Sequence, residues 1–415
     1  MKDLWYYLPS VPLYLLMMGI EQWVMSRRGE STYNFADTIT NVNCGLGQQA
    51  MSVATTAVAF ALYHWGYDHL AFFHFAPGSW APWVIAFVGL DFSYYWYHRS
   101  SHRVNVLWAM HNVHHQSEYL NFGVALRQPW FTDLTGILFY WTFPLLGVPI
   151  FPFLMASSFL ALYQVWLHTR MVGKFERVGL IFNTPSYHRV HHGRDARYLN
   201  HNFGATLIIW DRLFGTFKVE DAEPRYGLTD AYNSLNPVWA QVQYFAKLIA
   251  RARQFDLLWD KVKLWVMPPE WSPAGVALSQ VNTESEPRIR FQRETPRALK
   301  PYIFVQYAIV MVATFIVVGA AGFMSWPHTM VAGLLSVLTV VNLGGLLEAK
   351  SWTPASEITR LVLFCIAAGW VAVNLGGLKL AVGGAVYALF SLGWFLSLLW
   401  TGSAVTFAVG ERHGS

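Results

Sequence analysis

Residues 183–193 read NTPSYHRVHHG, and this stretch predicts a short helix that carries three histidines. Thr184 is suited to cap a helix that begins at Pro185, and a glycine at the end of the stretch is suited to terminate it. Positions i, i+3 and i+4 of a helix lie on one face. We therefore expect His188, His191 and His192 to point toward one metal site.

Histidines gather at three further places before this stretch. They are His98-x-x-x-His102, His111-x-x-His114-His115 and the single His168. Only eight residues separate the first two clusters, so a short turn is expected to fold the second back over the first. Nine imidazoles are too many for one four-coordinate ion, and the set predicts more than one metal.

The identity of the metal is narrowed by what the sequence lacks. There is no Glu-x-x-His pair, which excludes a carboxylate-bridged di-iron bundle, and no His-Glu-x-x-His, which excludes a zincin protease. Cys44 and Cys365 lie in apolar segments that are far apart in the sequence. They therefore indicate neither a disulfide framework nor a thiolate metal site. Nitrogen ligands suit iron, zinc, copper or nickel. Among these metals, a redox-active pair of irons best explains why so many ligands gather at a membrane surface. Iron activates O2, which is needed to attack an unactivated C–H bond of a lipid.

The composition places these clusters in a membrane protein. Of 415 residues, 54% are hydrophobic and 13% charged, whereas an ordinary soluble domain has about 25% charged residues. The sequence therefore predicts an all-α polytopic membrane protein, a transmembrane helix bundle with a histidine-rich di-metal cap. The expected spans lie near residues 4–25, 43–64, 81–97, a closely spaced pair across 130–168, 303–324, 329–347, 358–376 and 380–402.

Charge and proline content divide the chain into three expected parts. They are a catalytic membrane domain over 1–270, a linker over 271–302 and a C-terminal four-helix membrane bundle over 303–415. The spans of the C-terminal bundle contain few charged residues, and the sequence does not indicate its function. Basic residues in 169–302 place this segment and the histidine site on the cytoplasmic side. The net charge of +5 is attributed to basic loops at anionic lipid, so no nucleic-acid partner is expected.

Several polar residues near the clusters are secondary candidates. Glu118 follows His115 by three residues, so it is either a bridging or supporting carboxylate of the metal site or a surface glutamate. Asp195 and Asp211 are candidates to hold an imidazole tautomer, or else turn residues. His201 and Asn202 are weaker candidates. The histidines without a cluster partner are expected to be solvated or interfacial: His64, His69, His74, His328 and His413.

The sequence motifs resemble those of the fatty acid hydroxylase and sterol desaturase superfamily of membrane di-iron oxygenases. The resemblance spans about residues 30–230 and is closest to the alkylglycerol subgroup. It rests on HRSSH at 98–102, WAMHNVHHQSE at 108–118, NFGVALRQ at 121–128, WLHT at 166–169, the 183–193 stretch and IWDRLFGTF at 209–217.

This resemblance implies two irons held by the three clusters in a cytoplasmic cap. It assigns as ligands His98, His102, His111, His114, His115, His188, His191 and His192. Many relatives carry a further His-x-x-x-His pair, of which His168 matches the second member while Gln164 replaces the first. The subgroup also has a required glutamate at the position of Glu118, which favours a catalytic role for that residue.

The resemblance further implies a reaction on lipid. The alkylglycerol subgroup hydroxylates the carbon next to the ether oxygen of glycerol ether lipids, and the product collapses to an aldehyde and glycerol. Tetrahydrobiopterin is the electron donor in that subgroup, while a ferredoxin or a cytochrome is the alternative. A sterol, carotenoid or fatty acyl hydroxylase or desaturase, and a non-catalytic zinc-binding or metal-transporting membrane protein, are the other functions considered. A sensor or second lipid enzyme in the C-terminal bundle is a further possibility.

Overall fold

The computed structural model describes residues 10–276, 290–291, 295–320, 325–375 and 377–401. Within these residues the regular secondary structure is helical, apart from one isolated antiparallel bridge between Phe182 and Leu207, which confirms the all-α prediction. The described residues form two compact units: the first lies within 9–233 and 239–291, and the second within 234–238 and 292–415. The domain boundaries expected at residues 270 and 302 stay a prediction.

The first unit begins with two helices that differ greatly in length, α2 (Ser10–Arg27) and α3 (Phe35–Leu70). Asn34 caps α3, and its side-chain oxygen accepts hydrogen bonds from the N–H groups of Ala36 (3.0 Å) and Asp37 (3.2 Å). Gly45 lets another segment approach α3, because a Cβ atom there would lie 2.5 Å from the carbonyl oxygen of Leu126. The amino-terminal half of α3 is thus packed into the unit, and not exposed along its whole length.

The first histidine cluster lies on α4 (Ala81–Arg103), and the second begins at the last residue of α5 (Asn105–His111) and continues in the turn that follows it. The two helices are separated only by Val104, whose extended backbone (φ −125°, ψ 118°) breaks the helical path. The sharp turn brings α5 back over the end of α4, as the spacing of the clusters predicts.

Four further helices follow: α6 (Phe122–Ala125), α7 (Thr132–Tyr140), α8 (Thr142–Leu145) and α9 (Ile150–Leu167). The expected pair of spans across 130–168 is wrong in its first half, because α7 and α8 have only nine and four residues and are too short to cross a bilayer. The chain turns instead at Gly147 (φ +75°), where a Cβ atom would lie 1.8 Å from the carbonyl oxygen of Phe73.

Close packing of α4 on α9 supports the histidine-bearing end of α4. Ala86 and Leu90 of α4 are buried in one cluster with Ala156 and Leu160 of α9. Small side chains at Ala86 and Ala156 let the two helices approach closely, which is the usual packing of helices in lipid. The two helices therefore form a rigid base for the site.

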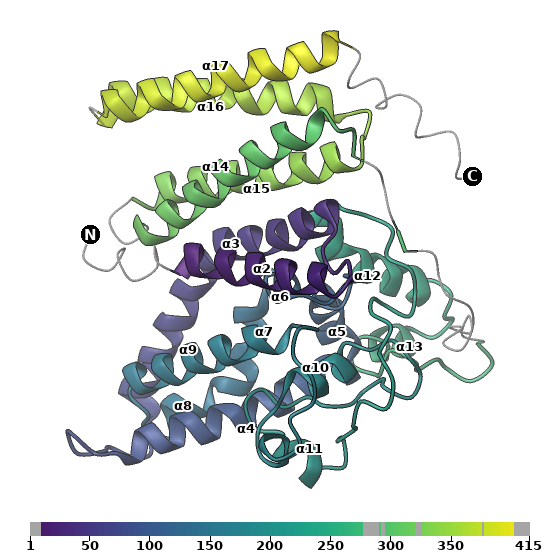
Figure 1. Cartoon of the computed structure of the whole chain (residues 1–415). Helices are drawn as coiled ribbons and strands as arrows, with labels where there is room; N and C mark the ends of the chain where they lie inside the picture. The colour runs from purple at the N-terminus through teal and green to yellow at the C-terminus, as the bar shows by residue number, and fades with distance from the viewer. Residues whose placement is uncertain (1–9, 277–289, 292–294, 321–324, 376, 402–415) are drawn as a thin grey trace. The chain divides into compact units, whose positions relative to one another are not determined.

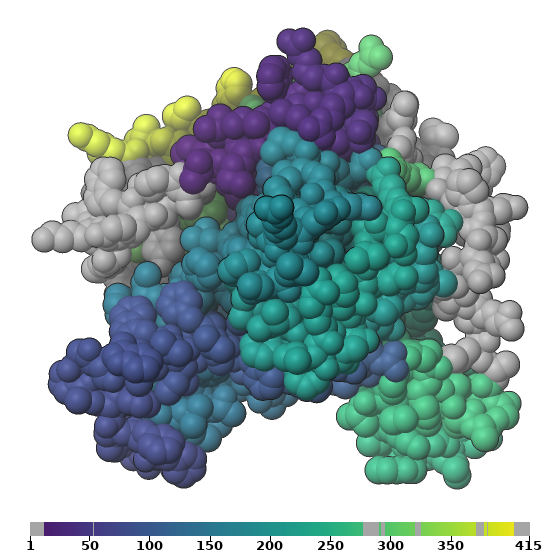
Figure 2. Space-filling view, turned by 60° about the horizontal axis from the view of Figure 1, so that its bottom comes forward, coloured from purple at the N-terminus to yellow at the C-terminus, as the bar shows by residue number. Residues whose placement is uncertain are grey.

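The rest of the first unit is loop-rich and carries η1 (Val178–Leu180), α10 (Pro185–His191), α11 (Ile209–Leu213), α12 (Pro237–Ala252) and α13 (Leu258–Lys263). The segment after α10, drawn in teal, covers much of the face shown in Figure 2. Asn105 joins α5 to this region: it donates to the carbonyl oxygen of Leu264 (2.9 Å) and accepts from the hydroxyl of Tyr244 (2.9 Å). These bonds connect α5 with α12 and the end of α13.

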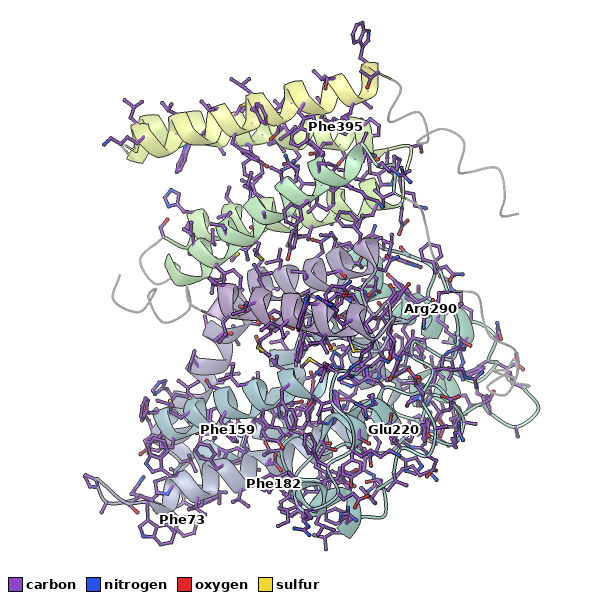
Figure 3. The ribbon with its side chains drawn as sticks, in the orientation of Figure 1. Phe73, Phe159, Phe182, Glu220, Arg290 and Phe395 are labelled. Carbon is purple, nitrogen blue, oxygen red and sulfur yellow. The ribbon has the colours of Figure 1, made fainter. Side chains whose placement is uncertain are left out.

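The second unit is built from α14 (Leu299–Ala320), α15 (Trp326–Leu347), α16 (Thr353–Leu375) and α17 (Leu378–Trp400). The pairs α14–α15 and α16–α17 each pack along their length (Figure 1). Phe395, labelled in Figure 3, lies fully buried between helices of this unit. Three of these four helices, α14, α15 and α17, are long and apolar enough to cross a membrane, and the four-helix membrane bundle stays a prediction.

The helices of the second unit enclose more charge than the sequence indicates. Arg360 and Glu357 of α16 form a fully buried ion pair (2.5 Å). Arg360 lies within the expected span, and Glu357 is also helical because α16 begins at Thr353. Arg360 also donates to Gln306 of α14 (2.8 Å) and to the hydroxyl of Tyr387 of α17 (3.2 Å). Asn342 of α15 donates to Glu357 (3.2 Å). One buried network thus connects all four helices.

Four of the described helices are long and apolar enough to cross a membrane, at Ile150–Leu167, Leu299–Gly319, Trp326–Leu347 and Ala381–Trp400. Apolar side chains also point outward from the first unit, among them Phe73, Phe159 and Phe182 (Figure 3). An exposed apolar surface of this extent is typical of contact with lipid. The chain is an integral membrane protein.

Candidate metal centre

All nine predicted histidines meet in two adjoining groups within the first unit. Their nearest nitrogen atoms lie within 4.8 Å of one another in each group. The first group contains His98, His102, His111, His115 and His191. The second contains His114, His168, His188 and His192. Eight of the nine side chains are buried and His102 is partly buried, so the site is shielded from solvent.

We expected the histidines of each sequence cluster to point toward one metal site. This is wrong, because the structure divides the histidines of a cluster between the two groups. His188 and His192 share the second group, whereas His191 joins the first. Adjacent helical residues differ by about 100° around the axis, so His191 and His192 diverge, while residues i and i+4 stay on one side. In the same way His111 and His115 stay together and His114 turns to the other group.

Backbone carbonyl groups fix the orientation of four imidazoles. The Nδ1 atoms of His98, His114, His168 and His191 lie 2.8–3.0 Å from the carbonyl oxygens of Phe203, Arg127, Gln164 and His201 respectively. A carbonyl oxygen only accepts, so Nδ1 carries the proton in each ring. The Nε2 lone pair of each ring is then directed into its group, which is the arrangement seen around bound metals.

The rings of His114 and His168 show most directly that the site is built for a cation. Their Nε2 atoms lie 3.0 Å apart, although both rings donate from Nδ1 to a carbonyl oxygen. Two lone pairs therefore face each other. Burial lowers the pKa of His114 to about 4, so a proton is not held there at neutral pH. A metal ion between the two rings satisfies both nitrogens.

The remaining distances fit the same interpretation. Nε2 of His188 lies 3.0 Å from that of His168 and 3.1 Å from that of His192. Ligand nitrogens at about 2.1 Å from one ion are separated by roughly 3.0 Å when they are adjacent in an octahedron. In the first group the Nε2 atoms of His102 and His191 are buried and have no hydrogen-bond partner in the described part of the chain. The residues present thus fit a pair of bound metal ions.

A buried arginine that we did not single out in the sequence holds the 111–115 segment in place. Arg127 donates to the carbonyl oxygen of Val113 (2.8 Å), to Asn41 (3.0 Å) and to Gln116 (2.6 Å). Its own carbonyl oxygen accepts from Nδ1 of His114. Arg127 stands in the NFGVALRQ motif, and the motif was the only sequence signal that pointed to it.

A second buried arginine positions the other histidine segments. Arg189 lies between His188 and His191 on α10 and forms a bidentate ion pair with Glu220 (2.7 and 2.8 Å). It also donates to the carbonyl oxygen of Thr169 (3.1 Å), which follows His168 directly. This contact links α10 to the end of α9, so His168 and His188 are held at a fixed separation.

The secondary candidates have structural roles away from the nitrogen atoms. Asp195 accepts from Arg225 (2.7 Å), and Asp211 accepts from the N–H of Phe203 (2.7 Å). Neither aspartate forms a hydrogen bond with an imidazole in the described structure, so of the two roles considered for them the structure favours the turn-forming one. Backbone carbonyls hold four of the imidazoles instead. Asp211 acts indirectly, since it fixes the loop whose Phe203 carbonyl binds His98.

The other minor candidates also lie outside the two groups. The ring of His201 contacts the carbonyl oxygen of Thr216 (3.1 Å), and Asn202 donates to Tyr187 and Lys218, in a left-handed backbone conformation (φ 57°). The Gln164 side chain donates to the carbonyl oxygen of Leu160 (3.2 Å). Thr184 precedes α10 as expected, but its side chain makes no capping bond within the described structure.

Glu118 belongs to neither histidine group. Its carboxylate accepts the backbone N–H of Phe291 (2.8 Å) and lines a neighbouring polar pocket. The structure thus places it beside the site, three residues beyond His115, and its catalytic role stays a prediction.

Comparison with known proteins agrees with this geometry. Residues 83–216, which contain all nine histidines, match the sequence profile described as fatty acid hydroxylase. Alkylglycerol monooxygenase of Danio rerio is 31% identical over 337 residues, covering 80% of this chain and 74% of that protein. The chain belongs to the fatty acid hydroxylase family. Alkylglycerol monooxygenase of Homo sapiens is 28% identical over 361 residues, covering 86% of this chain and 80% of its own length.

Another relative is named for a different lipid. Ornithine lipid hydroxylase OlsE of Rhizobium tropici is 30% identical over 294 residues, covering 67% of this chain and 85% of that protein. No solved structure matches the chain. Membership of the family makes this protein a lipid hydroxylase enzyme, with a lipid substrate and O2 as co-substrate.

Proposed function

We propose that this enzyme is a di-iron monooxygenase that hydroxylates the carbon next to the ether oxygen of a glycerol ether lipid. The observation that carries the metal assignment is the pair of facing Nε2 lone pairs of His114 and His168, 3.0 Å apart. The relatives named alkylglycerol monooxygenase, at 28–31% identity, support the substrate.

The two groups of histidines would each hold one iron. The first would use His98, His102, His111, His115 and His191, and the second His114, His168, His188 and His192. When bound, iron supplies the redox chemistry that activates O2. The chain itself contributes neutral ligands, since burial lowers the pKa values of the imidazoles, and a site closed to bulk water. We keep Glu118 as the proposed catalytic carboxylate.

An apolar cavity in the first unit supports a hydrocarbon substrate. It has a volume of about 300 Å³ and lies among α3, α7 and α9, where Phe60, Ile137, Tyr140 and Phe153 are part of its lining. Aromatic rings continue from Tyr140 toward the metal site. The ring centroids are separated by 6.0 Å from Tyr140 to Tyr97, 6.2 Å from Tyr97 to Tyr94 and 5.3 Å from Tyr94 to His98. We propose that part of the lipid chain binds in this cavity.

The proposed reaction balances with one molecule of O2 and two electrons. One oxygen atom enters the C–H bond next to the ether oxygen, and the other leaves as water after taking up two protons. The resulting hemiacetal collapses, and its C–O bond to glycerol breaks to give an aldehyde and free glycerol. The electrons come from a donor that we propose to be a reduced pterin, with a ferredoxin or cytochrome as the alternative.

The histidine site is proposed to face the cytoplasm. Arg27 ends α2 and Arg28 follows it, and Arg170 and Lys174 follow α9, which matches the enrichment of basic residues on the cytoplasmic side.

A second candidate reaction is lipid hydroxylation without ether cleavage. It is favoured by the relative named ornithine lipid hydroxylase, of which this chain covers 85%. The two reactions share the same first bond to break, a C–H bond of the chain. They differ in the product, because only a hydroxyl next to an ether oxygen releases an aldehyde.

The test is to purify the full chain anaerobically, measure metals by mass spectrometry, and add 1-O-alkylglycerol with a reduced pterin under O2. We expect about two irons per chain and O2-dependent release of aldehyde. A hydroxylated lipid that keeps its headgroup would support the second candidate. A chain that binds no iron after reconstitution, or that binds zinc and oxidises no lipid, would contradict the proposal.

A further inference from the structure

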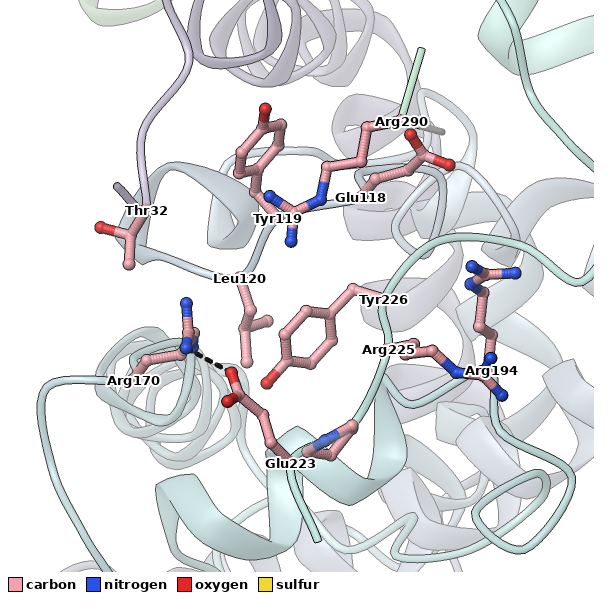
Figure 4. A pocket seen from close by; sticks show the side chains of 11 residues that line it. Thr32, Glu118, Tyr119, Leu120, Arg170, Arg194, Glu223, Arg225, Tyr226 and Arg290 are labelled. Atoms are coloured by element: carbon pink, nitrogen blue, oxygen red, sulfur yellow. Dashed lines mark ion pairs between the residues drawn. The ribbon is translucent and has the colours of Figure 1, made fainter. Parts of the chain in front are cut away.

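A polar pocket of about 520 Å³ lies beside the metal centre in the first unit. Figure 4 shows its side chains, which come from segments far apart in the sequence. Its charged lining consists of Arg170, Arg194, Arg225, Arg290, Glu118 and Glu223. The lining is therefore rich in charge of both signs, unlike the apolar cavity among α3, α7 and α9.

The guanidinium groups of this pocket are partly balanced by carboxylates. Arg170 forms ion pairs with Glu30 (2.8 Å) and Glu223, and Arg225 pairs with Asp195 (2.7 Å). Arg290 lies 4.7 Å from the ring centroid of Tyr119 and has no carboxylate partner among the described residues. A simple anion would meet the two lining glutamates, whereas a headgroup with both charges matches the lining.

An unpartnered hydroxyl group indicates that the pocket is built for a ligand. Tyr226 is 7% exposed, and its hydroxyl is buried without a hydrogen-bond partner in the described part of the chain. Figure 4 shows its ring lying across the pocket, with the hydroxyl end toward the side of Arg170 and Glu223. A buried hydroxyl without a partner is costly, and a ligand in the pocket would satisfy it.

The pocket is joined to the metal centre by three short connections. Glu118 follows His115 by three residues, Arg170 follows His168 by two, and Arg194 follows His192 by two. Two or three extended residues span at most about 7–11 Å. A group in the pocket therefore lies only a small molecule's length from the metal centre.

We propose that this pocket binds a zwitterionic headgroup of the lipid substrate. The arginines and the Tyr226 hydroxyl would hold its phosphate or carboxylate, and Glu118 and Glu223 its ammonium group. The inference rests on the proposed function in one respect: it takes the pocket's ligand to be the lipid that is oxidised. Only a glycerol separates such a headgroup from the carbon next to the ether oxygen, which matches the short distance from pocket to metal centre.

The first experiment measures binding and needs no turnover. The full chain in uncharged detergent is titrated calorimetrically with glycerophosphoethanolamine, glycerol 3-phosphate, inorganic phosphate and glycerol. We expect glycerophosphoethanolamine to bind at least tenfold more tightly than inorganic phosphate, and glycerol not to bind. Equal affinity for the zwitterion and for inorganic phosphate would identify an anion site only and would overturn the proposal, as would no binding of any probe.

Variants locate the binding in this pocket. Tyr226→Phe removes a hydroxyl that has no hydrogen-bond partner among the residues the structure describes, so folding should be unaffected. We expect it to weaken glycerophosphoethanolamine binding roughly tenfold, the usual effect of losing a hydrogen bond to a charged group. Arg290→Gln, at an exposed position, should weaken binding roughly two- to fivefold. The exposed Arg197, outside the pocket lining, provides the control Arg197→Gln, which should bind like the wild type. Unchanged affinity in both pocket variants would overturn the proposal.

A second readout separates this inference from the proposed function. The ratio of kcat/KM for an alkyl glycerophosphoethanolamine to that for the uncharged alkylglycerol should fall roughly tenfold in Tyr226→Phe. An unchanged ratio would contradict the headgroup assignment while ether cleavage still stands. Tight, Tyr226-dependent binding in an enzyme that cleaves neither ether would uphold the pocket and remove only the ether-lipid reaction.

Discussion

Replacing Arg127 with methionine should destabilise the protein and disturb one metal position more than the other. The guanidinium makes three hydrogen bonds, to Val113, Asn41 and Gln116, and lies in a fully buried setting. Asp37 is partly buried near it: burial raises the pKa of its carboxyl, and the charge of Arg127 opposes that shift. Methionine has similar length but leaves these acceptors and Asp37 without a buried cation.

The magnitude follows from those contacts. Breaking a buried charge interaction by removing one partner costs about 3–5 kcal/mol. For a unit of this size, 1 kcal/mol shifts the thermal midpoint by roughly 2–4 °C, so the expected fall is roughly 6–20 °C. Arg127→Lys keeps the charge but not the planar set of donors, and its midpoint should lie between those of the wild type and Arg127→Met.

The assay combines thermal unfolding in detergent with metal content by mass spectrometry. Because Arg127 supports the segment and the carbonyl group that orient His114, the second histidine group should lose metal before the first. We expect about one metal per chain in Arg127→Met and two in the exposed control Arg197→Met. A variant with a midpoint within 2 °C of the wild type and two bound metals would refute this reasoning.

Three further predictions concern the ligands, the pH dependence and the second unit. His192→Ala should lower the metal content from two ions to one, measured by mass spectrometry, whereas His69→Ala should keep both, since only His192 lies in a histidine group. Burial lowers the pKa of His114 to about 4, so metal should stay bound when the pH falls from 7 to 5.5 and leave near pH 4; release centred near 6.5 would contradict this. Below pH 6.5 the histidines of the unfolded chain bind protons, whereas the buried imidazoles of the metal-free fold stay neutral because their pKa values are lowered. The thermal midpoint of the metal-free protein should therefore fall as the pH is lowered below 6.5. Arg360→Leu leaves Glu357 buried without its cation. It should lower the unfolding free energy of the second unit by about 3–5 kcal/mol, and with it the thermal midpoint. Replacing both residues by leucine should recover most of this loss.

The gathering of the nine histidines could be predicted because their spacing and number are unusual in an otherwise apolar chain. The division into two groups could not. Helical geometry separates His191 from His192, but which group each joins depends on how α10 lies against α4 and α9. That packing depends on contacts between distant segments, which one sequence does not reveal.

The partners of the imidazoles were missed for a different reason. Aspartate and glutamate are visible in a sequence, so Asp195 and Asp211 were considered as candidates for this role or else as turn residues. The acceptors are instead carbonyl oxygens of residues such as Phe203 and Gln164. Every residue has a carbonyl group, so its use in orienting a ring leaves no sequence signature.

The charged network of the second unit was also hidden. Glu357 and Arg360 stand close to the start of an apolar run, where charges usually mark the end of a span and contact water. Their three-residue spacing lets them pair on one face of α16, and Gln306, Asn342 and Tyr387 come from three other helices. Pairing of this kind depends on tertiary structure, so the sequence alone favoured the simpler interpretation.

The position of the histidines along the chain has a consequence for how the protein is made. The last of them, His192, precedes the start of α14 at Leu299 by 107 residues. At a synthesis rate of 5–20 residues per second, the ribosome needs roughly 5–20 s to make that length. Every proposed ligand is therefore available while the C-terminal helices are still being translated. On the proposed function, we expect metal to load onto the nascent chain, so that the supply of iron during translation affects how much enzyme matures.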